Sequence, residues 1–179
     1  TEILGPPDTP GIDILQVICS RRLPRKFPQQ VMAEAGKFQG QVTDEDIDGR
    51  EDWRNRPVFT IDPDDARDFD DAILVEKRKD GGWDLAVHIA DVSHYVKPGS
   101  HLDREARLRG NSTYLADRVI PMLPETLSNG LCSLVPGEDR LTHAAIMSFD
   151  RHAGPKSLRF SKAVIRSARR FTYKQAHAL

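Results

Sequence analysis

The sequence predicts a mixed α/β protein, of the α+β kind, in which a mostly antiparallel sheet is flanked by helices. Three observations lead to this prediction. Helix signals open the chain, before residue 57. Beyond that point short strand-like apolar segments recur, and tight turns join two pairs of them, which favours antiparallel hairpins. The 179 residues are 39% apolar and 30% charged, so a soluble chain with a real core is expected.

The first 56 residues predict two helices and an irregular segment. Thr9 has the side chain of an N-cap, and Pro10 suits the first helical position that follows it. The apolar stripe of this helix is formed by Ile14, Leu15, Ile18 and Cys19. A second helix is expected over residues 28–36. Residues 37–56 are polar and acidic, and we expect them to form a loop on the outside.

Strands are predicted from residue 57 onward. The expected segments are 57–61, 72–78, 83–90, 141–149 and 156–166. Lys79-Asp-Gly-Gly82 supplies the glycines of a tight turn between the second and third segments, and residues 150–155 join the last two. Alternation within the third segment places three apolar side chains on one side: Leu85, Val87 and Ile89.

Two more helices are predicted from capping signals. Ser100 followed by Asp103 is close to a capping box, and Gly110 is expected to end the helix that starts there. Thr172 and Gln175 form a full capping box, which predicts a last helix near residue 172.

Composition favours a cytoplasmic protein, or one in an organelle stroma. No apolar run approaches about 18 residues, and no basic-then-apolar segment opens the chain, so no membrane span is expected. Cys19 and Cys132 show no metal-type spacing and are interpreted as buried free thiols in a reducing compartment.

Charge is distributed unevenly, although the net charge is only −1. Residues 43–71 hold twelve acidic residues and four arginines, whereas residues 140–179 hold nine Lys or Arg and one acid. An acidic pocket beside a basic surface suits a protein that binds phosphates. The alternative is that the basic side chains simply point outward from strands.

The densest motif is the twelve-residue stretch from Thr60 to Asp71, which contains six aspartates between two apolar segments. Like charges packed this closely repel one another, and a bound cation offsets that cost. Magnesium prefers carboxylate oxygens, which makes this a candidate site for phosphoryl-transfer chemistry. The alternative is a solvated acidic loop. An EF-hand is excluded because, counted from Asp62, Arg67 stands where glycine is needed and Ile73 where glutamate is needed.

Four of these aspartates carry a specific resemblance. Asp62, Asp68, Asp70 and Asp71 form the pattern D-x5-D-x-D-D after a strand-like Thr-Ile. This pattern resembles the catalytic signature of the ribonuclease II/ribonuclease R family. Further blocks resemble the family in the same order along the chain: VHIADVSHYV at 87–96, NSTYL at 111–115, IPMLP at 120–124 and LSNGLCSL at 127–134. The sequences of these blocks most resemble those of the ribonuclease R branch.

The resemblance implies a fold and an organisation. Residues 57–179 would form the first portion of a truncated catalytic domain of the RNB type. Residues 1–56 would be a helical linker segment after a cold-shock-type domain that this chain does not contain. The family's catalytic domain is about twice as long as the part present here, so we expect the fragment alone to be inactive.

The resemblance also implies an activity. Members hydrolyse single-stranded RNA processively from the 3′ end to nucleoside 5′-monophosphates with two metal ions, Mg²⁺ or possibly Mn²⁺, in RNA decay and processing. Asp62, Asp68, Asp70 and Asp71 would be the catalytic residues and metal ligands. Tyr114 and Tyr173 fall where the family places tyrosines that contact RNA near its 3′ end.

Several expectations about the site follow from the residues themselves. In extended backbone Asp68, Asp70 and Asp71 cannot all point one way, so we expect an irregular loop at Asp68–Asp71. Asp64 and Asp65 fall outside the pattern and are interpreted as peripheral or solvated. The histidines are interpreted as structural or surface residues. Two alternative functions remain: a catalytically silent RNA-binding module, and a metal-dependent phosphatase, against which the basic segment and the two tyrosines argue.

Overall fold

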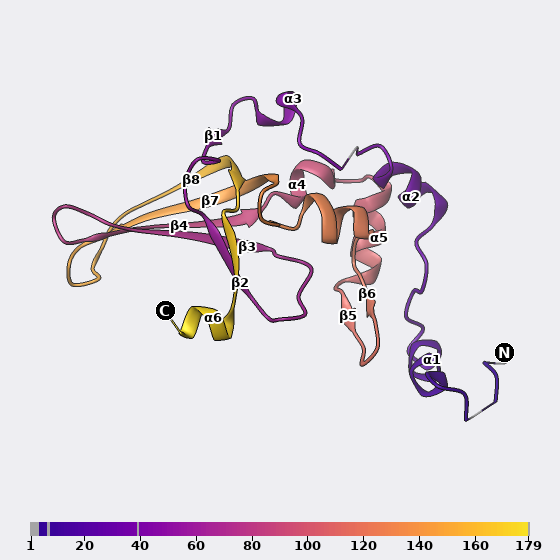
Figure 1. Ribbon diagram of the computed structural model, residues 1–179. Helices are drawn as coiled ribbons and strands as arrows, with labels where there is room; N and C mark the ends of the chain where they lie inside the picture. Colours follow the sequence, from indigo (N-terminus) through magenta and orange to yellow (C-terminus); the bar gives the residue numbers. More distant parts are fainter. Residues whose placement is uncertain (1–3, 7, 39, 179) are drawn as a thin grey trace. The chain divides into compact units, whose positions relative to one another are not determined.

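The computed structural model describes residues 4–6, 8–38 and 40–178 (Figure 1). The chain forms two compact units: unit 1 (Thr1–Phe38 with Val96–Glu125) and unit 2 (Gln39–Tyr95 with Thr126–Leu179). The helices are α1 (Ile12–Ser20), α2 (Gln29–Ala35), α3 (Asp44–Ile47), α4 (Val92–Tyr95), α5 (His101–Arg109), the π-helical η1 (Thr126–Leu131) and α6 (Tyr173–His177). The strands are β1 (Glu51–Asp52), β2 (Phe59–Asp62), β3 (Asp71–Lys77), β4 (Trp83–Ala90), β5 (Thr113–Tyr114), β6 (Val119–Ile120), β7 (Asp139–Phe149), β8 (Pro155–Arg166) and β9 (Arg169–Thr172). None of the helices described is long and apolar enough to cross a membrane.

The first helix of unit 1 begins later than predicted. Thr9 is not its N-cap, because Gly11 occupies that position with a φ of 82°. The backbone turns before the helix starts, with the Ile12 amide donating to the Thr9 carbonyl at 3.1 Å. A left-handed φ is accessible to glycine at little steric cost, so the glycine sets the start of the helix rather than the threonine.

The other helices of unit 1 agree with the capping signals. The Asp103 amide donates to the Ser100 hydroxyl at 3.1 Å, as predicted. A carboxylate oxygen of Glu34 in α2 accepts from the amides of His101 at 2.8 Å and Leu102 at 3.2 Å. Glu34 thus satisfies two amides at the start of α5 that have no partner within the helix. Leu102 is fully buried beneath this contact.

Unit 2 is built on a seven-stranded sheet in the order β1-β8-β7-β4-β3-β2-β9. The four central pairings are antiparallel, and the two edge pairings, β1 with β8 and β2 with β9, are parallel. The predicted mixed α/β class with a mostly antiparallel sheet is therefore confirmed. Both predicted hairpins are present, and their paired strands lie side by side in Figure 1.

The turn between β3 and β4 requires its second glycine. A Cβ on Gly82 would lie 2.3 Å from the carbonyl oxygen of Phe149, which is too close for any side chain. The Gly82 amide donates to an Asp80 carboxylate oxygen at 3.1 Å, which fixes the turn from within. The Lys79-Asp-Gly-Gly82 signal thus predicts the turn correctly.

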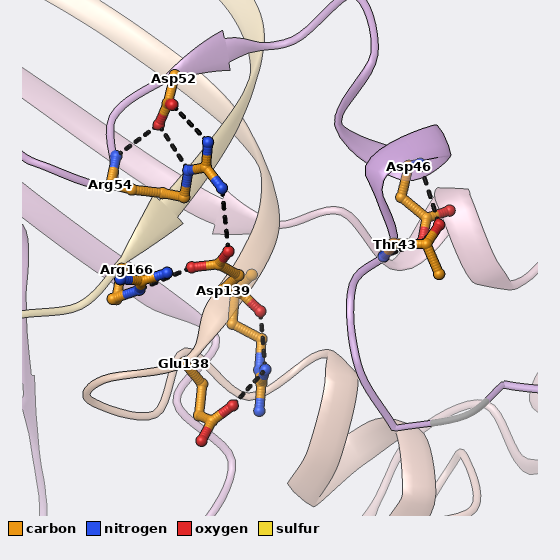
Figure 2. Close-up of polar contacts among 8 residues, drawn as sticks. Thr43, Asp46, Asp52, Arg54, Glu138, Asp139 and Arg166 are labelled. Carbon is orange, nitrogen blue, oxygen red and sulfur yellow. Dashed lines mark hydrogen bonds and ion pairs between the residues drawn. The ribbon is translucent and has the colours of Figure 1, made fainter.

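The segment of residues 37–56 is more ordered than the predicted loop. Thr43 and Asp46 form a capping box that begins α3, shown in Figure 2, and β1 then pairs with β8. Figure 2 also shows Arg54 binding both Asp52 and Asp139, at 2.6 and 3.2 Å. The prediction of a loop over residues 37–56 was wrong because it rested on the acidic character of the segment alone. In the fold these acidic side chains cap a helix or pair with arginines.

The buried side of β4 is not the side that carries its larger apolar residues. Leu85, Val87 and Ile89 do share one side, as predicted, but Ile89 is 48% exposed. The buried side carries Ala86, His88 and Ala90. The core of unit 2 therefore lies against the side of β4 that carries two alanines and a histidine.

Candidate active site

The candidate site lies in the loop of residues 62–71, here called the aspartate loop. Asp62 is the last residue of β2 and lies opposite Thr172 in the parallel neighbour β9. Asp71 is the first residue of β3 and lies opposite Ile89, near the end of β4. The aspartate loop therefore emerges at the edge of the sheet where β2, β4 and β9 end.

The predicted irregularity at Asp68–Asp71 is found for Asp68–Asp70, since residues 63–70 belong to no strand or helix, whereas Asp71 already begins β3. Phe69 is buried in the middle of this stretch, while Asp70 is exposed. An apolar anchor between two aspartates gives the loop a fixed point in the core of unit 2.

Asp62 is the buried member of the cluster, with 8% of its surface exposed. Burial raises the pKa of its carboxyl above the ordinary value, and the negative charges of Asp71 and Asp68 raise it further. The positive charge of Arg170 opposes this shift. Among the described residues, the Oδ2 atom of Asp62 has no hydrogen-bond partner.

The negative charges of the same cluster also affect the pKa of the Asp70 carboxyl. Partial removal of its carboxyl from water raises the pKa, and the charges of three other aspartates raise it further: Asp68, Asp71 and Asp62. The four aspartates of the sequence pattern are thus close enough to repel one another. The fold therefore places the other three aspartates of the pattern where their charges act on Asp70.

The cluster is not a complete metal-binding set. In the part of the chain that the structure describes, no three or more His, Cys, Asp or Glu side chains are gathered as a group that could hold a metal ion. The donor chemistry nevertheless fits a hard divalent cation. The oxygens are carboxylates, they repel each other, and one buried oxygen of Asp62 lacks a partner. The assignment of the four aspartates as ligands stays a prediction.

Ser133 holds the aspartate loop from the segment that follows η1. Its hydroxyl donates to the Arg67 carbonyl at 2.8 Å and accepts from the Phe69 amide at 3.0 Å. The Leu134 amide donates to the Phe69 carbonyl at 2.8 Å. Arg140 of β7 is buried and donates from Nε to the Ser133 carbonyl at 2.8 Å. The loop is thereby tied to the sheet through one buried serine.

Arg170 of β9 holds the other end of the loop. Its guanidinium donates to the Pro63 carbonyl and lies over the Phe69 ring, 5.1 Å from the centroid. Its Nε is buried without a hydrogen-bond partner among the described residues. Arg170 is therefore a cation beside Asp62 that also fixes the backbone of the loop.

The other two aspartates of the loop lie apart from this cluster, as expected. Asp64 is exposed and pairs with Lys174 at 3.5 Å, and Asp65 is exposed. Neither contributes to the raised pKa of Asp62 or Asp70. An exposed pair of this kind contributes little to stability.

The two predicted RNA-contacting tyrosines belong to different units. Tyr114 is in β5 of unit 1 and 64% exposed, and Tyr173 is the first residue of α6 in unit 2 and 62% exposed. Tyr173 follows Thr172, which pairs with Asp62, so it is at the same end of the sheet as the aspartate loop. Both rings are exposed enough for a base to stack on them.

Three histidines of unit 2 make contacts that explain their presence. His88 is fully buried, its Nδ1 lies 3.1 Å from the Thr142 hydroxyl, and its ring packs edge-on against Trp53. Burial lowers the pKa of His88 to about 4, so the ring is neutral at pH 7. His94 and His143 pair with acids at 2.7 and 3.2 Å. These contacts agree with the structural role expected for them.

The basic segment of residues 140–179 is not a freely exposed positive surface. Arg140 is buried, and Lys156, Arg159, Arg166 and Lys174 pair with carboxylates. Pairing with acids in β1, β7 and the turns neutralises much of the charge that the sequence concentrates there.

The relationship to known proteins agrees with this geometry. A family described as "RNB domain" matches residues 50–179, which include the whole aspartate loop. The chain belongs to the RNB family. "Ribonuclease R 2" of Lactococcus lactis is 45% identical over 179 residues, covering 100% of this chain and 27% of that protein. "Ribonuclease R" of Thermotoga maritima is 49% identical over 178 residues, covering 98% of this chain and 25% of that protein.

A solved RNB-family structure has the same fold. Mycoplasma genitalium RNase R in complex with double-stranded RNA superposes with a TM-score of 0.91 at 35% identity, covering 99% of this chain and 31% of that one. The resemblance inferred from the sequence blocks is therefore confirmed. The chain spans about a quarter of the length of the curated relatives named here.

Sequence reasoning missed the residues that hold the aspartate loop in place. In the sequence, Ser133 is one residue of the block at 127–134, and Arg170 is one of the nine basic residues between 140 and 179. Neither has a local sequence signal, because each acts on backbone atoms more than 60 residues away. Only the fold shows that they meet the aspartates.

Proposed function

We propose that this chain forms the first part of the catalytic domain of a 3′→5′ exoribonuclease of the ribonuclease R kind. Membership of the RNB family and similarity to proteins named ribonuclease R support an exoribonuclease. The observation that carries the proposal is the aspartate cluster at one end of the sheet, in which the charges of neighbouring aspartates raise the pKa of Asp62 and of Asp70. In this proposal, residues 57–179 belong to the catalytic domain and residues 1–56 precede it as a linker segment.

Asp62, Asp68, Asp70 and Asp71 would hold Mg²⁺ or Mn²⁺. When bound, two such ions supply an activated water and stabilise the leaving 3′-oxygen of the RNA. The chain's part is to fix the carboxylates: Phe69 anchors the loop in the core, and Arg170 limits the repulsion felt by Asp62. The free carboxylate oxygen of Asp62 is the group best placed to accept a cation.

Tyr114 and Tyr173 would bind RNA by stacking. Stacking of a base on an aromatic ring contributes about 1–3 kcal/mol and depends little on sequence, which suits a processive enzyme that removes nucleoside 5′-monophosphates one by one. The Mycoplasma genitalium relative has been solved with RNA bound. We propose single-stranded RNA as the substrate here, in RNA degradation in the cytoplasm.

The chain alone should not turn over RNA. It covers about a quarter of its relatives' length, and alignment of the substrate contributes many kcal/mol to a catalytic barrier. Activity is therefore expected of a full-length enzyme that contains this chain. The two should differ in rate by several orders of magnitude at equal concentration.

The test is a product assay with 5′-labelled single-stranded RNA and a full-length enzyme that contains this chain. We expect a descending ladder of shortened strands, release of 5′-monophosphates, and loss of both on adding EDTA. Restoration by Mn²⁺ or Mg²⁺ but not by Ca²⁺ would separate catalysis from simple charge neutralisation. Internal cuts of random length, or cleavage that survives EDTA, would contradict the proposal.

A catalytically silent RNA-binding module is the second candidate. The specific observation in its favour is that the described carboxylates are not gathered into a complete metal-binding set. This candidate predicts tight RNA binding by the full-length protein with no product at any metal concentration. The same assay, run beside a binding titration, therefore separates the two.

A further inference from the structure

Ser133 joins the aspartate loop to the rest of unit 2 through a hydroxyl that both donates and accepts a hydrogen bond. Its hydroxyl donates to the carbonyl of Arg67 and accepts from the amide of Phe69, which lie one residue before Asp68 and one residue before Asp70. The residue is 0% exposed. We propose that Ser133 is a positioning residue that fixes the positions of Asp68 and Asp70 for metal binding; this inference rests on the function proposed above.

The hydrogen bonds of Ser133 have a specific consequence for the loop. With the Leu134 amide bonded to the Phe69 carbonyl, both backbone polar groups of Phe69 are held by residues 133–134. Asp68 and Asp70 are attached directly to Phe69. A shift of the Phe69 backbone therefore moves both carboxylates together, and metal sites tolerate only small displacements.

The support for Ser133 comes from the sheet. Arg140 of β7 donates from Nε to the Ser133 carbonyl and from Nη1 to the Asp139 carbonyl, both at 2.8 Å. The line of contacts thus runs from β7 through Arg140 and Ser133 to Phe69. Groups that orient metal ligands in this indirect way typically alter metal affinity or activity by about 10–100-fold when they are removed.

A hydroxyl is needed at position 133 because one of its two contacts requires a hydrogen-bond donor and the other requires an acceptor. One contact is a backbone acceptor, at Arg67, and the other is a backbone donor, at Phe69. Ser or Thr offers a donor and an acceptor from one atom, which an alanine does not. Ser133→Ala leaves both backbone groups without this partner in a buried place, so the loop must move or admit water.

The first experiment measures backbone hydrogen exchange in this chain without metal. In Ser133→Ala the Phe69 amide should exchange at least about tenfold faster than in the parent. The matched control is Ser167→Ala, since Ser167 is also buried but its hydroxyl donates to the Arg169 carbonyl, which lies outside the aspartate loop. Exchange at Phe69 should stay unchanged in that control. Unchanged exchange in Ser133→Ala would overturn the proposal.

The second experiment uses a full-length enzyme that contains this chain. Ser133→Ala should lower kcat by about 10–100-fold and raise the Mn²⁺ concentration for half-saturation, measured by calorimetry, by a similar factor. The KM for RNA should stay within about threefold, because phosphate contacts and stacking elsewhere supply most RNA affinity. Ser133→Thr, which keeps the hydroxyl, should recover most of the Mn²⁺ affinity.

The outcomes separate this inference from the proposed function. Normal Mn²⁺ affinity and kcat with fast Phe69 exchange would show that Ser133 fixes the loop without positioning ligands, which overturns the inference. If the parent enzyme cleaves no RNA, the proposed function fails, and the inference is then decided by Mn²⁺ affinity alone. Should Ser133→Ala fail to fold, Ser133→Cys replaces it, because the thiol is only a weak donor and acceptor and predicts the same changes.

Discussion

Replacing Asp70 with asparagine should stabilise the metal-free chain at neutral pH. The Asp70 carboxylate is opposed by three other carboxylates, whose charges raise its pKa. Two unit charges about 7 Å apart, at an effective dielectric of about 40–80, repel by roughly 0.6–1.2 kcal/mol. Three neighbours at that separation would give about 2–4 kcal/mol, but Asp70 is exposed and solvent screening reduces the total to about 1 kcal/mol. In a chain of this size that corresponds to a rise in Tm of about 2–4 °C.

The pH dependence of this effect has a definite sign. Because the folded pKa of Asp70 is raised, the folded state binds the proton more tightly, and stability falls as pH rises through that pKa. The advantage of Asp70→Asn should therefore be complete at pH 7 and absent below pH 3.8, the ordinary value for the group. Thermal or urea unfolding at both pH values measures it.

The matched control is Asp65→Asn, an exposed aspartate of the same loop outside the cluster. It should change Tm by less than about 1 °C, since isolated surface substitutions have small effects. Added Mn²⁺ should reduce the advantage of Asp70→Asn, because the parent chain gains more from binding the ion. A lower Tm for Asp70→Asn at pH 7, or an equal gain in the control, would refute the electrostatic reasoning.

Three other predictions concern stacking, a buried ion pair and a buried histidine. In the full-length enzyme, Tyr114→Ala should change the length of the final RNA product while Mn²⁺ affinity is kept; an unchanged product would make Tyr114 structural. Arg50→Met should destabilise the chain by about 3–5 kcal/mol in urea unfolding, because Asp91, 2.7 Å away and 1% exposed, loses its buried partner; a loss below about 1 kcal/mol would contradict this. In an NMR titration the His88 ring should stay neutral until about pH 4, and titration near 6.5 would show that the ring is not buried. The free energy of unfolding should fall as pH drops from 6.5 towards 4, because only the unfolded chain takes up the proton in that range.

The strands and hairpins of unit 2 could be predicted because their signals are local. Alternation marks residues 83–90, and the glycine at position 82 is demanded by a single close approach to Phe149. Capping signals at Ser100 and Thr172 likewise act within four residues. What could not be predicted depends on distant parts of the chain, such as the pairing of β1 with β8.

The candidate site likewise has one part that local sequence signals predict and another part that depends on distant residues. The spacing of the four aspartates is a local pattern, and the fold brings those residues together. The pattern does not contain Ser133 or Arg170, which contact the loop from the segment after η1 and from β9. The burial of His88 was equally hidden, because the larger apolar side chains of β4 face the more open side of the sheet.

The most direct test of the account is to compare cleavage and binding in Asp70→Asn of a full-length enzyme that contains this chain. Asparagine is nearly isosteric but lacks the charge that holds a catalytic ion, so product formation at saturating enzyme should fall by at least about a thousandfold. RNA affinity, measured by fluorescence polarisation at fixed salt, should stay within about threefold or tighten slightly, since phosphate contacts elsewhere supply most of it. Near-normal cleavage would remove Asp70 from the catalytic set and contradict the metal assignment, and loss of binding together with cleavage would show that Asp70 shapes the loop instead.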